Sequence, residues 1–235
     1  MRFKVNELNK CDISPCNFTS SVVYWEPDYN NWFINSMADY SKLYVGVLAL
    51  QGDFERHSYQ LSLLGAKPVE VRVVSQLDVI DGLIIPGGES TTMDILIDRF
   101  GLREPLIKFG QGKPLWGTCA GMIMIAKNIV NNQAGVKPLG LMDIDVDRNF
   151  YGRQLYSFED KIAARLDDKD EELTATFIRA PGVSRVGENV EILARHSDKP
   201  ILLKQANLLA SSFHTELDED TRLMAYFLQN FLMKK

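Results

Sequence analysis

The sequence predicts an α/β fold: a mainly parallel central sheet flanked by helices, with antiparallel strands toward the C-terminal half. Two observations predict it. Between residues 43 and 129, short apolar runs alternate with segments of helical periodicity, which is the pattern of parallel strands joined by helices. After residue 129, strand-like runs follow one another without long helices between them. Such runs indicate antiparallel pairing at one side of the sheet.

The first half of this pattern begins with a continuous apolar run over residues 43–50, which suits a strand buried on both faces. A helix is expected from about residue 54 to 64, with Asp53 as its cap and Gly65 at its end. The other elements expected here are strands over 69–73, 83–85 and 114–117, and helices over 92–100, 103–109 and 120–129.

The second half is expected to be mainly strands, over residues 142–146, 174–178, 190–194, 201–204 and 208–212. The acidic stretch 167–172 is interpreted as a solvated loop. A last helix over 220–233 is amphipathic. Its apolar face carries Leu223, Met224, Phe227, Leu228 and Phe231.

Residues 1–42 differ from the remainder, because their scattered aromatic residues keep neither a period of 2 nor one of 3.6. We expect an appendage there, partly disordered or laid on the surface of the domain. Met37 is an alternative start for the cellular protein. Residues 43–235 are expected to form one domain, since a chain of 235 residues that is 46% hydrophobic can bury one sizeable core.

Charge and composition argue against several classes of function. A net charge of −5 without a basic run argues against binding nucleic acid through phosphate contacts. The apolar runs are too short for a membrane span, and the first 20 residues lack the apolar core of a signal peptide. The three cysteines, Cys11, Cys16 and Cys119, are too few for a disulfide framework and suggest a reducing, cytoplasmic location. Neither a metal nor a cofactor is expected, as no further ligands accompany the first two cysteines.

One segment has the layout of a nucleophile elbow. An apolar strand runs into Gly117-Thr118-Cys119-Ala120-Gly121, and a helical pattern follows. The two glycines permit a strained turn, and the start of a helix favours a thiolate at Cys119. A buried and inert cysteine is the alternative that this segment alone leaves open.

A cysteine nucleophile needs a group that relays protons near neutral pH, and the chain has three histidines. His57 lies within the first expected helix, where a surface or ordinary helix role is favoured. His196 is expected in an exposed turn. His214 stands at the end of an apolar strand, and Glu216 shares its face of an extended chain. Glu216 can therefore orient the imidazole, and with Cys119 the two residues complete a candidate triad.

Two glycines, Gly87 and Gly88, directly follow a buried strand and lead into a helix. A phosphate-binding loop is excluded, because no Gly-Lys-Ser/Thr follows. The segment is either an ordinary strand-to-helix turn or an oxyanion site. In the second case Gly87 or Gly88 supplies one backbone N–H and Ala120 the other.

Six motifs in this order resemble the class I (triad) glutamine amidotransferase family, a flavodoxin-like fold, and within it the glutaminase subunits of pyridoxal 5′-phosphate synthase. They are Leu50–Asp53, Pro86–Thr92, Gly117–Gly121, Arg148-Asn149 with Gly152–Gln154, Phe177–Pro181 and Ser212–Glu216. The resemblance covers residue 43 to the C-terminus, and residues 1–42 have no counterpart. Thr215 stands where these families usually have proline, which is expected to loosen the geometry of His214 and Glu216 slightly.

The resemblance implies hydrolysis of L-glutamine to glutamate and ammonia through a thioester on Cys119, with His214 as acid and base and Glu216 orienting it. It also implies a set of substrate contacts and an activation switch. The substrate contacts are Gly88, Glu89, Ser90, Arg148, Ile178 and Arg179, and the switch is Gln51 with Gly52.

No part of the chain is left over to house an ammonia acceptor, so the acceptor enzyme is expected to be a separate subunit. By resemblance it is the barrel-shaped pyridoxal 5′-phosphate synthase subunit, and the glutaminase is expected to be largely silent until docked. Three alternatives stay open: the glutaminase of another complex such as imidazole glycerol phosphate synthase, a DJ-1-like redox protein, and a non-catalytic regulatory subunit.

Overall fold

A computed structural model describes residues 38–148, 157–218 and 220–233. The expected appendage up to residue 37, with Cys11, Cys16 and the alternative start at Met37, lies outside the described residues. The same is true of Asn149 and of the Gly152–Gln154 part of its motif. The division of the chain at residue 43 stays a prediction.

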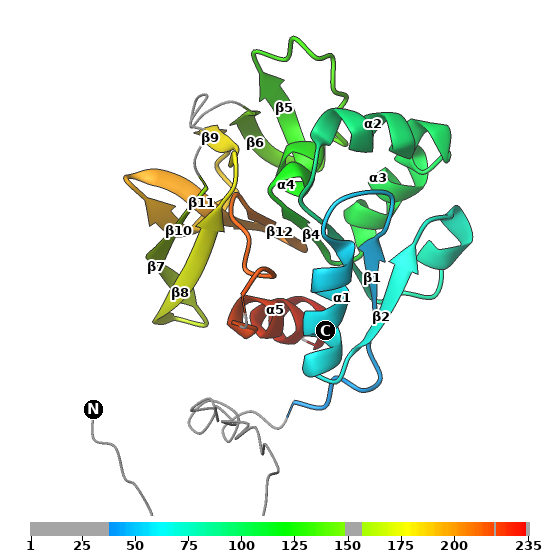
Figure 1. The fold of residues 1–235 in the computed structure, drawn as a ribbon, viewed down its shortest axis with the longest axis horizontal. Helices are drawn as coiled ribbons and strands as arrows, with labels where there is room; N and C mark the ends of the chain where they lie inside the picture. Colours follow the sequence, from blue (N-terminus) through cyan, green and yellow to red (C-terminus); the bar gives the residue numbers. More distant parts are fainter. Residues whose placement is uncertain (1–37, 149–156, 219, 234–235) are drawn as a thin grey trace, which may run out of the picture. The chain divides into compact units, whose positions relative to one another are not determined.

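Strands and helices alternate in the first half of the described chain, and strands dominate the second (Figure 1). The first half contains β1 (Tyr44–Leu48), α1 (Phe54–Leu63), β2 (Lys67–Val71), the 3-10 helix η1 (Val74–Leu77), β3 (Gly82–Ile85), α2 (Ser90–Arg99), α3 (Arg103–Gly112), β4 (Leu115–Thr118) and α4 (Ala120–Ile125). The second contains β5 (Ala126–Val130), β6 (Met142–Asp147), β7 (Phe158–Leu166), β8 (Lys169–Phe177), β9 (Gly182–Val186), β10 (Glu191–His196), β11 (Lys199–Gln205), β12 (Leu208–Ser211), α5 (Arg222–Phe227) and the π-helical η2 (Leu228–Met233).

Within the described residues, nine strands form one mixed sheet in the order β2-β1-β3-β4-β12-β11-β10-β7-β8. The strands from β2 to β12 are parallel, and each later pairing is antiparallel. The predicted α/β class and the antiparallel strands at one side of the sheet are therefore confirmed. The antiparallel part is as extensive as the parallel part.

The core lies on both faces of this sheet because side chains alternate along each strand. On β3, Leu83 and Ile85 join the apolar cluster that includes α2, α3 and α4, whereas Ile84 joins the cluster that includes α1 and α5. Figure 1 shows the same layering, with α2, α3 and α4 together and α1 near α5. Both faces of the parallel strands are thus covered by helices.

The expected helix over residues 120–129 is wrong in its second half. Helix α4 ends at Ile125, and Ala126 already has an extended backbone, with ψ of 155°. Residues 126–130 instead form β5, an edge strand that pairs with β6 in a separate three-stranded sheet of order β5-β6-β9. Ile129 and Val130 are β-branched, and pairing with β6 outweighs the helical spacing of the apolar residues.

The acidic stretch 167–172 is also wrong as a loop. Only Asp167 and Asp168 form the turn, with φ of 50° and 62°, and Lys169–Phe177 form β8 opposite β7. The missed strand β7 buries Ile162, Ala164 and Leu166 in alternation with exposed residues. One face of this hairpin is solvated, so its charged residues hide the strand pattern in the sequence. Strand β9 was missed as well.

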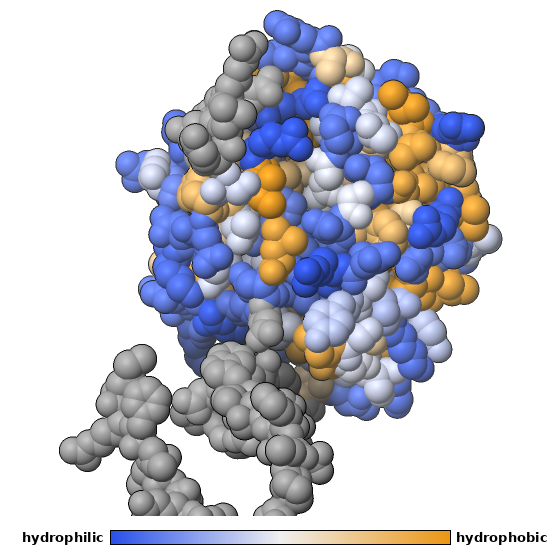
Figure 2. All heavy atoms as spheres, viewed as in Figure 1, coloured by the Kyte–Doolittle hydropathy of each residue, from blue (hydrophilic) through white to orange (hydrophobic). Residues whose placement is uncertain are grey.

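The last helix is confirmed as an amphipathic element, with a π-helical continuation from Leu228. All five residues expected on its apolar face are buried. Across the described ranges, no helix is long and apolar enough to cross a membrane. Figure 2 shows hydrophilic residues over much of the visible face, with the hydrophobic ones more frequent toward its right-hand edge.

Candidate active site

The carboxyl ends of three neighbouring parallel strands bring the predicted site residues to one edge of the sheet. β4 lies between β3 and β12, with Ile85 opposite Gly117 and Ser211 opposite Thr118. The loop after β3 carries Gly87, β4 leads directly into Cys119, and His214 follows β12. Ligands of open α/β sheets bind at such an edge.

Cys119 has the strained backbone of an elbow, with φ of 51° and ψ of −102°. Its N–H donates to the Ser211 carbonyl oxygen over 2.8 Å, and its Sγ lies 3.9 Å from the Ile178 carbonyl oxygen. A Cβ on Gly121 would lie 2.0 Å from the Ile85 carbonyl oxygen. The glycine therefore lets α4 approach β3 closely enough to form the turn.

His214 and Glu216 are hydrogen-bonded, with 2.5 Å between Nδ1 and Oε1. The backbone of His214 is fixed by a bridge to Thr176, with N–O distances of 2.9 and 3.1 Å. The Thr215 N–H donates to Glu216 Oε2 over 3.0 Å. Proline has no such N–H. Thr215 thus contributes a hydrogen bond to the carboxylate that the residue usual in the family cannot make.

The electrostatics favour a carboxylate on Glu216 and a proton on His214. Burial alone would lower the pKa of His214, but hydrogen bonding to Cys119 and Glu216 outweighs it and raises the pKa to about 10. Burial alone would raise the pKa of Glu216, but the neighbouring His57 and the hydrogen bond with His214 lower it to about 2. His214 is thus held by the carboxylate of Glu216 and lines the same cavity as Cys119.

The glycine loop after β3 packs directly against the imidazole. A Cβ on Gly87 would lie 2.3 Å from His214 Cε1, and one on Gly88, where φ is 144°, would lie 2.4 Å from Gln51 Nε2. The Gln51 side chain in turn accepts the Glu89 N–H over 3.2 Å and donates to the Glu89 carbonyl oxygen over 3.3 Å. The structure therefore brings Gln51 and both glycines to one place beside His214.

Glu89 caps helix α2, which is why this helix begins at Ser90 and not at the expected residue 92. Its carboxylate accepts the N–H groups of Thr91 and Thr92 over 3.0 and 2.7 Å, and Arg148 Nη2 lies 3.3 Å from Glu89 Oε1. Burial alone would raise the pKa of Glu89, but the hydrogen bonds from the two threonines lower it to about 2. Glu89 is therefore a carboxylate at neutral pH.

A cavity of about 230 Å³ brings most of the predicted site residues together. It is lined by Gly88, Glu89, Ser90, Cys119, Ala120, Arg148, Ile178, Arg179 and His214, and also by Asp53 and Ile123, which sequence reasoning did not select. Asp53 was expected as a helix cap, but its side chain makes no capping hydrogen bond.

Comparison with protein families matches residues 47–233 to the SNO glutamine amidotransferase family. The chain belongs to this family. The pyridoxal 5′-phosphate synthase subunit PdxT of Dehalococcoides mccartyi is 51% identical over 187 residues, which are 79% of this chain and 95% of that protein. The subunit of the same name from Thermosipho africanus is 49% identical over 78% of this chain and 96% of its own length.

The fold agrees with that membership. A crystal structure of a glutamine amidotransferase is 46% identical to this chain and superposes with a TM-score of 0.73. The matched part covers 79% of this chain and 97% of that structure. The family assignment therefore extends from sequence to the arrangement of strands and helices.

In this glutamine amidotransferase family member, two histidines differ from expectation. His57 is fully buried, not at the surface: its Nε2 lies 3.6 Å from Glu216 Oε1, and its ring meets Trp116 edge-on. Its position three residues before Gln60, on the buried face of α1, was the available signal. His196 ends β10 and lies 3.0 Å from Asp160, because the turn itself is formed by the next two residues.

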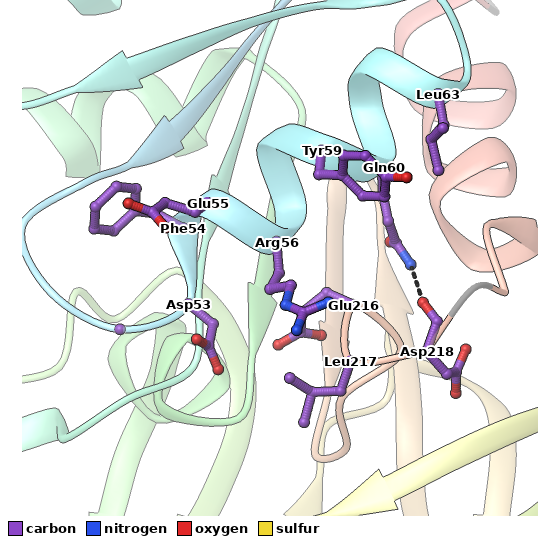
Figure 3. Close-up of a pocket in the computed structure, with 11 residues that line it drawn as sticks. Asp53, Phe54, Glu55, Arg56, Tyr59, Gln60, Leu63, Glu216, Leu217 and Asp218 are labelled. Carbon is purple, nitrogen blue, oxygen red and sulfur yellow. Dashed lines mark hydrogen bonds between the residues drawn. The ribbon is translucent and has the colours of Figure 1, made fainter. Parts of the chain in front are cut away.

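A second cavity, of about 750 Å³, has Glu216 in its lining (Figure 3). Its lining comes from one face along the whole of α1 with the residues just before it, and from the segment after His214: Gly52, Asp53, Phe54, Glu55, Arg56, Tyr59, Gln60, Leu63, Glu216, Leu217 and Asp218. Figure 3 shows the hydrogen bond from Gln60 to the Asp218 carbonyl oxygen, over 3.3 Å. Glu216 thus lines the second cavity, whereas His214 lines the first.

Proposed function

We propose that this chain hydrolyses L-glutamine to L-glutamate and ammonia, and that it passes the ammonia to a separate pyridoxal 5′-phosphate synthase subunit in vitamin B6 biosynthesis. One observation carries the reaction. Cys119, on a strained turn, and His214, hydrogen-bonded to the buried carboxylate of Glu216, line one cavity in a member of the glutamine amidotransferase family. A cysteine, a relay base and a group that orients it are what acyl transfer from an amide requires.

The reaction begins with attack of the Cys119 thiolate on the side-chain amide carbon of glutamine. The oxyanion is held by the backbone N–H of Ala120 and by that of Gly87 or Gly88. The imidazolium of His214 protonates the departing ammonia, which leaves a γ-glutamyl thioester on the sulfur. Water, deprotonated by His214, then releases glutamate. General acid–base help contributes about 10²–10⁴-fold, and one oxyanion donor about 10²–10³-fold.

Glutamine also presents an α-carboxylate and an α-ammonium, and the cavity lining suits both. Arg148 and Arg179 provide guanidinium groups for the carboxylate, because their forked donors match its geometry. Gly88, Glu89, Ser90 and Ile178 make the remaining contacts in this proposal. At about 230 Å³ the cavity is smaller than sites for drug-sized ligands, which measure roughly 300–1,000 Å³. That size suits a single amino acid.

The delivery of ammonia to a partner rests on the relatives. The relatives that cover most of this chain are synthase subunits by name. Gln51 and Gly52 act in this proposal as the activation switch, and the contact of Gln51 with the oxyanion loop supports that role. The cysteine content supports a cytoplasmic location.

The test uses the full chain with a purified pyridoxal 5′-phosphate synthase barrel and follows glutamate release and formation of the pyridoxal phosphate product. We expect weak glutaminase activity alone, a rise when the barrel is added, and no glutamate from Cys119→Ala in either case. A barrel of imidazole glycerol phosphate synthase serves as the control partner. Activation by that control and not by the first barrel would contradict the assigned pathway, and full activity of Cys119→Ala would contradict the mechanism.

A further inference from the structure

His57 is a buried polar side chain whose place the triad does not explain. It is fully buried on the inner face of α1, and neither ring nitrogen has a hydrogen-bond partner among the described residues. Native proteins rarely leave such groups unsatisfied, so each case calls for a reason. Packing alone would be served as well by an apolar residue, since the ring lies edge-on against the apolar Trp116.

A polar group that lies close to His57 is the carboxylate of Glu216, which is hydrogen-bonded to His214. His57 Nε2 lies 3.6 Å from Glu216 Oε1, the same oxygen that is 2.5 Å from His214 Nδ1. The other oxygen of Glu216 already accepts the Thr215 N–H. His57 is therefore placed to contact the oxygen that is shared with His214.

The environment of His57 favours a neutral imidazole whose N–H points toward Glu216. The titratable groups that act on it are Glu216 and His214, after β12, and Asp53, at the start of α1. Burial lowers the pKa of His57, against the attraction of Glu216. A neutral imidazole has one N–H and one lone pair. A lone pair on Nε2 would repel the carboxylate oxygen, so the proton belongs on Nε2.

Helix α1 is held against the segment after His214, which fixes the position of His57. The Gln60 side chain, one turn along the same face, donates to the carbonyl oxygens of Thr215, Asp218 and Asp220 at 2.9, 3.3 and 3.2 Å. The distance of 3.6 Å between His57 Nε2 and Glu216 Oε1 exceeds the length of a hydrogen bond by about 0.5 Å. Hydrogen bonds of catalytic groups are often long without substrate and shorten in the substrate complex.

We propose that His57 is a positioning residue for the glutaminase reaction: its Nε2–H closes onto Glu216 Oε1 and holds that carboxylate, and through it His214, in line with Cys119. This inference rests on the proposed function. It adds one donor to the carboxylate at the moment when His214 carries its proton. A carboxylate that is held by three donors keeps the imidazole in one orientation and one tautomer.

The test compares two substitutions of nearly equal length, His57→Gln and His57→Met. The first retains an N–H donor near the position of Nε2, and the second has none. The readout is the rate at which iodoacetamide alkylates Cys119, followed by peptide mass over a range of pH, together with kcat and KM of the full chain with the synthase. Leu61→Ala, a buried residue of the same helix, is the control for lost stability.

We expect His57→Met to move the midpoint of the alkylation profile up by about one pH unit, which makes alkylation about tenfold slower at pH values well below that midpoint. The same variant lowers kcat by about tenfold and leaves KM within about twofold, because glutamine does not touch His57. His57→Gln stays within about threefold of the parent chain. Leu61→Ala melts at a lower temperature with an unchanged alkylation profile. A His57→Met variant with the parent profile and the parent kcat overturns the inference.

A measurement on the unaltered chain covers the case in which His57→Met fails to fold. With only three histidines in the sequence, selective ¹⁵N labelling resolves each ring by NMR. We expect His57 to stay neutral near pH 7 with its proton on Nε2. A proton on Nδ1 and a bare Nε2 would overturn the inference. If alkylation follows the expected pattern and the synthase assay gives no glutamate, the proposed function fails and the role of His57 does not.

Discussion

Replacing Gly87 by alanine tests the placement of His214 most directly. The added Cβ would lie 2.3 Å from His214 Cε1 and 3.2 Å from its Nδ1. Carbon atoms in contact are about 3.5–4.0 Å apart, so the ring would have to retreat by more than about 1 Å. That movement breaks the bond of 2.5 Å to Glu216 or the alignment with Cys119. A displacement of about 1 Å in an active site lowers the rate by about 10²-fold.

The assay is kcat/KM for glutamate release by the full chain with the synthase barrel, beside thermal unfolding of each variant. We expect Gly87→Ala to lose about 10²-fold in kcat/KM while it still unfolds cooperatively. Gly112→Ala is the matched control, because nothing lies within 4 Å of its added Cβ and it ends helix α3. Its activity should equal that of the parent chain. A folded Gly87→Ala variant with the parent activity would refute the placement of His214 against this loop.

Three further predictions follow from the site. Arg148→Ala raises KM for glutamine by roughly 10–100-fold with little change in kcat, since a hydrogen bond to a charged group contributes about 1.5–3 kcal/mol. Steady-state kinetics measure both constants, and an unchanged KM argues against binding of the substrate carboxylate by Arg148. Thr215→Val raises the free energy of unfolding by about 1 kcal/mol, because within the described chain the buried Thr215 hydroxyl has no partner; urea unfolding should show no such gain for Thr215→Ser. Stability should also depend on pH from both sides. The contribution of His214 is complete below about pH 6.5, its ordinary pKa, and is lost as the pH rises to about 10, whereas that of Glu216 is complete above about pH 4.3 and is lost toward about pH 2. In Glu216→Gln, the urea midpoint should depend less on pH at both ends of the range from pH 2 to 10. An unchanged pH dependence in this variant would contradict the interaction between His214 and Glu216.

The sequence could predict the parallel part of the fold because each of its strands and helices has a distinct pattern within a short stretch of sequence. A buried strand such as β3 is a short apolar run bounded by turn residues, and the helix after it has its own period. The solvated hairpin of β7 and β8 was harder, because its outer face is charged and only every second residue is apolar. β5 was misread since its apolar residues extend the helical spacing of α4, and only pairing with β6 makes them a strand.

Some residues of the candidate site could likewise be predicted from local sequence, and others could not. Cys119 and the glycines of its loop could be found because a strand end, a glycine turn and a helix start are neighbours in sequence. The carboxyl ends of adjacent parallel strands then bring such turns together without further information. His57 could not be found by this route, since a histidine in a helical pattern does not say which distant group its buried face will meet.

The packing of α1 explains why the sequence does not reveal which group His57 meets. Gln60 bonds the Thr215 carbonyl oxygen across 155 residues of sequence, so the position of His57 depends on how a helix near the start of the domain packs against a loop near its end. Local motifs bring Cys119 and His214 to one cavity, whereas packing between distant elements acts on the orientation of Glu216. A change on the inner face of α1 should therefore alter the rate at which Cys119 is alkylated without changing any motif of the candidate site, which is a result that sequence motifs alone do not predict.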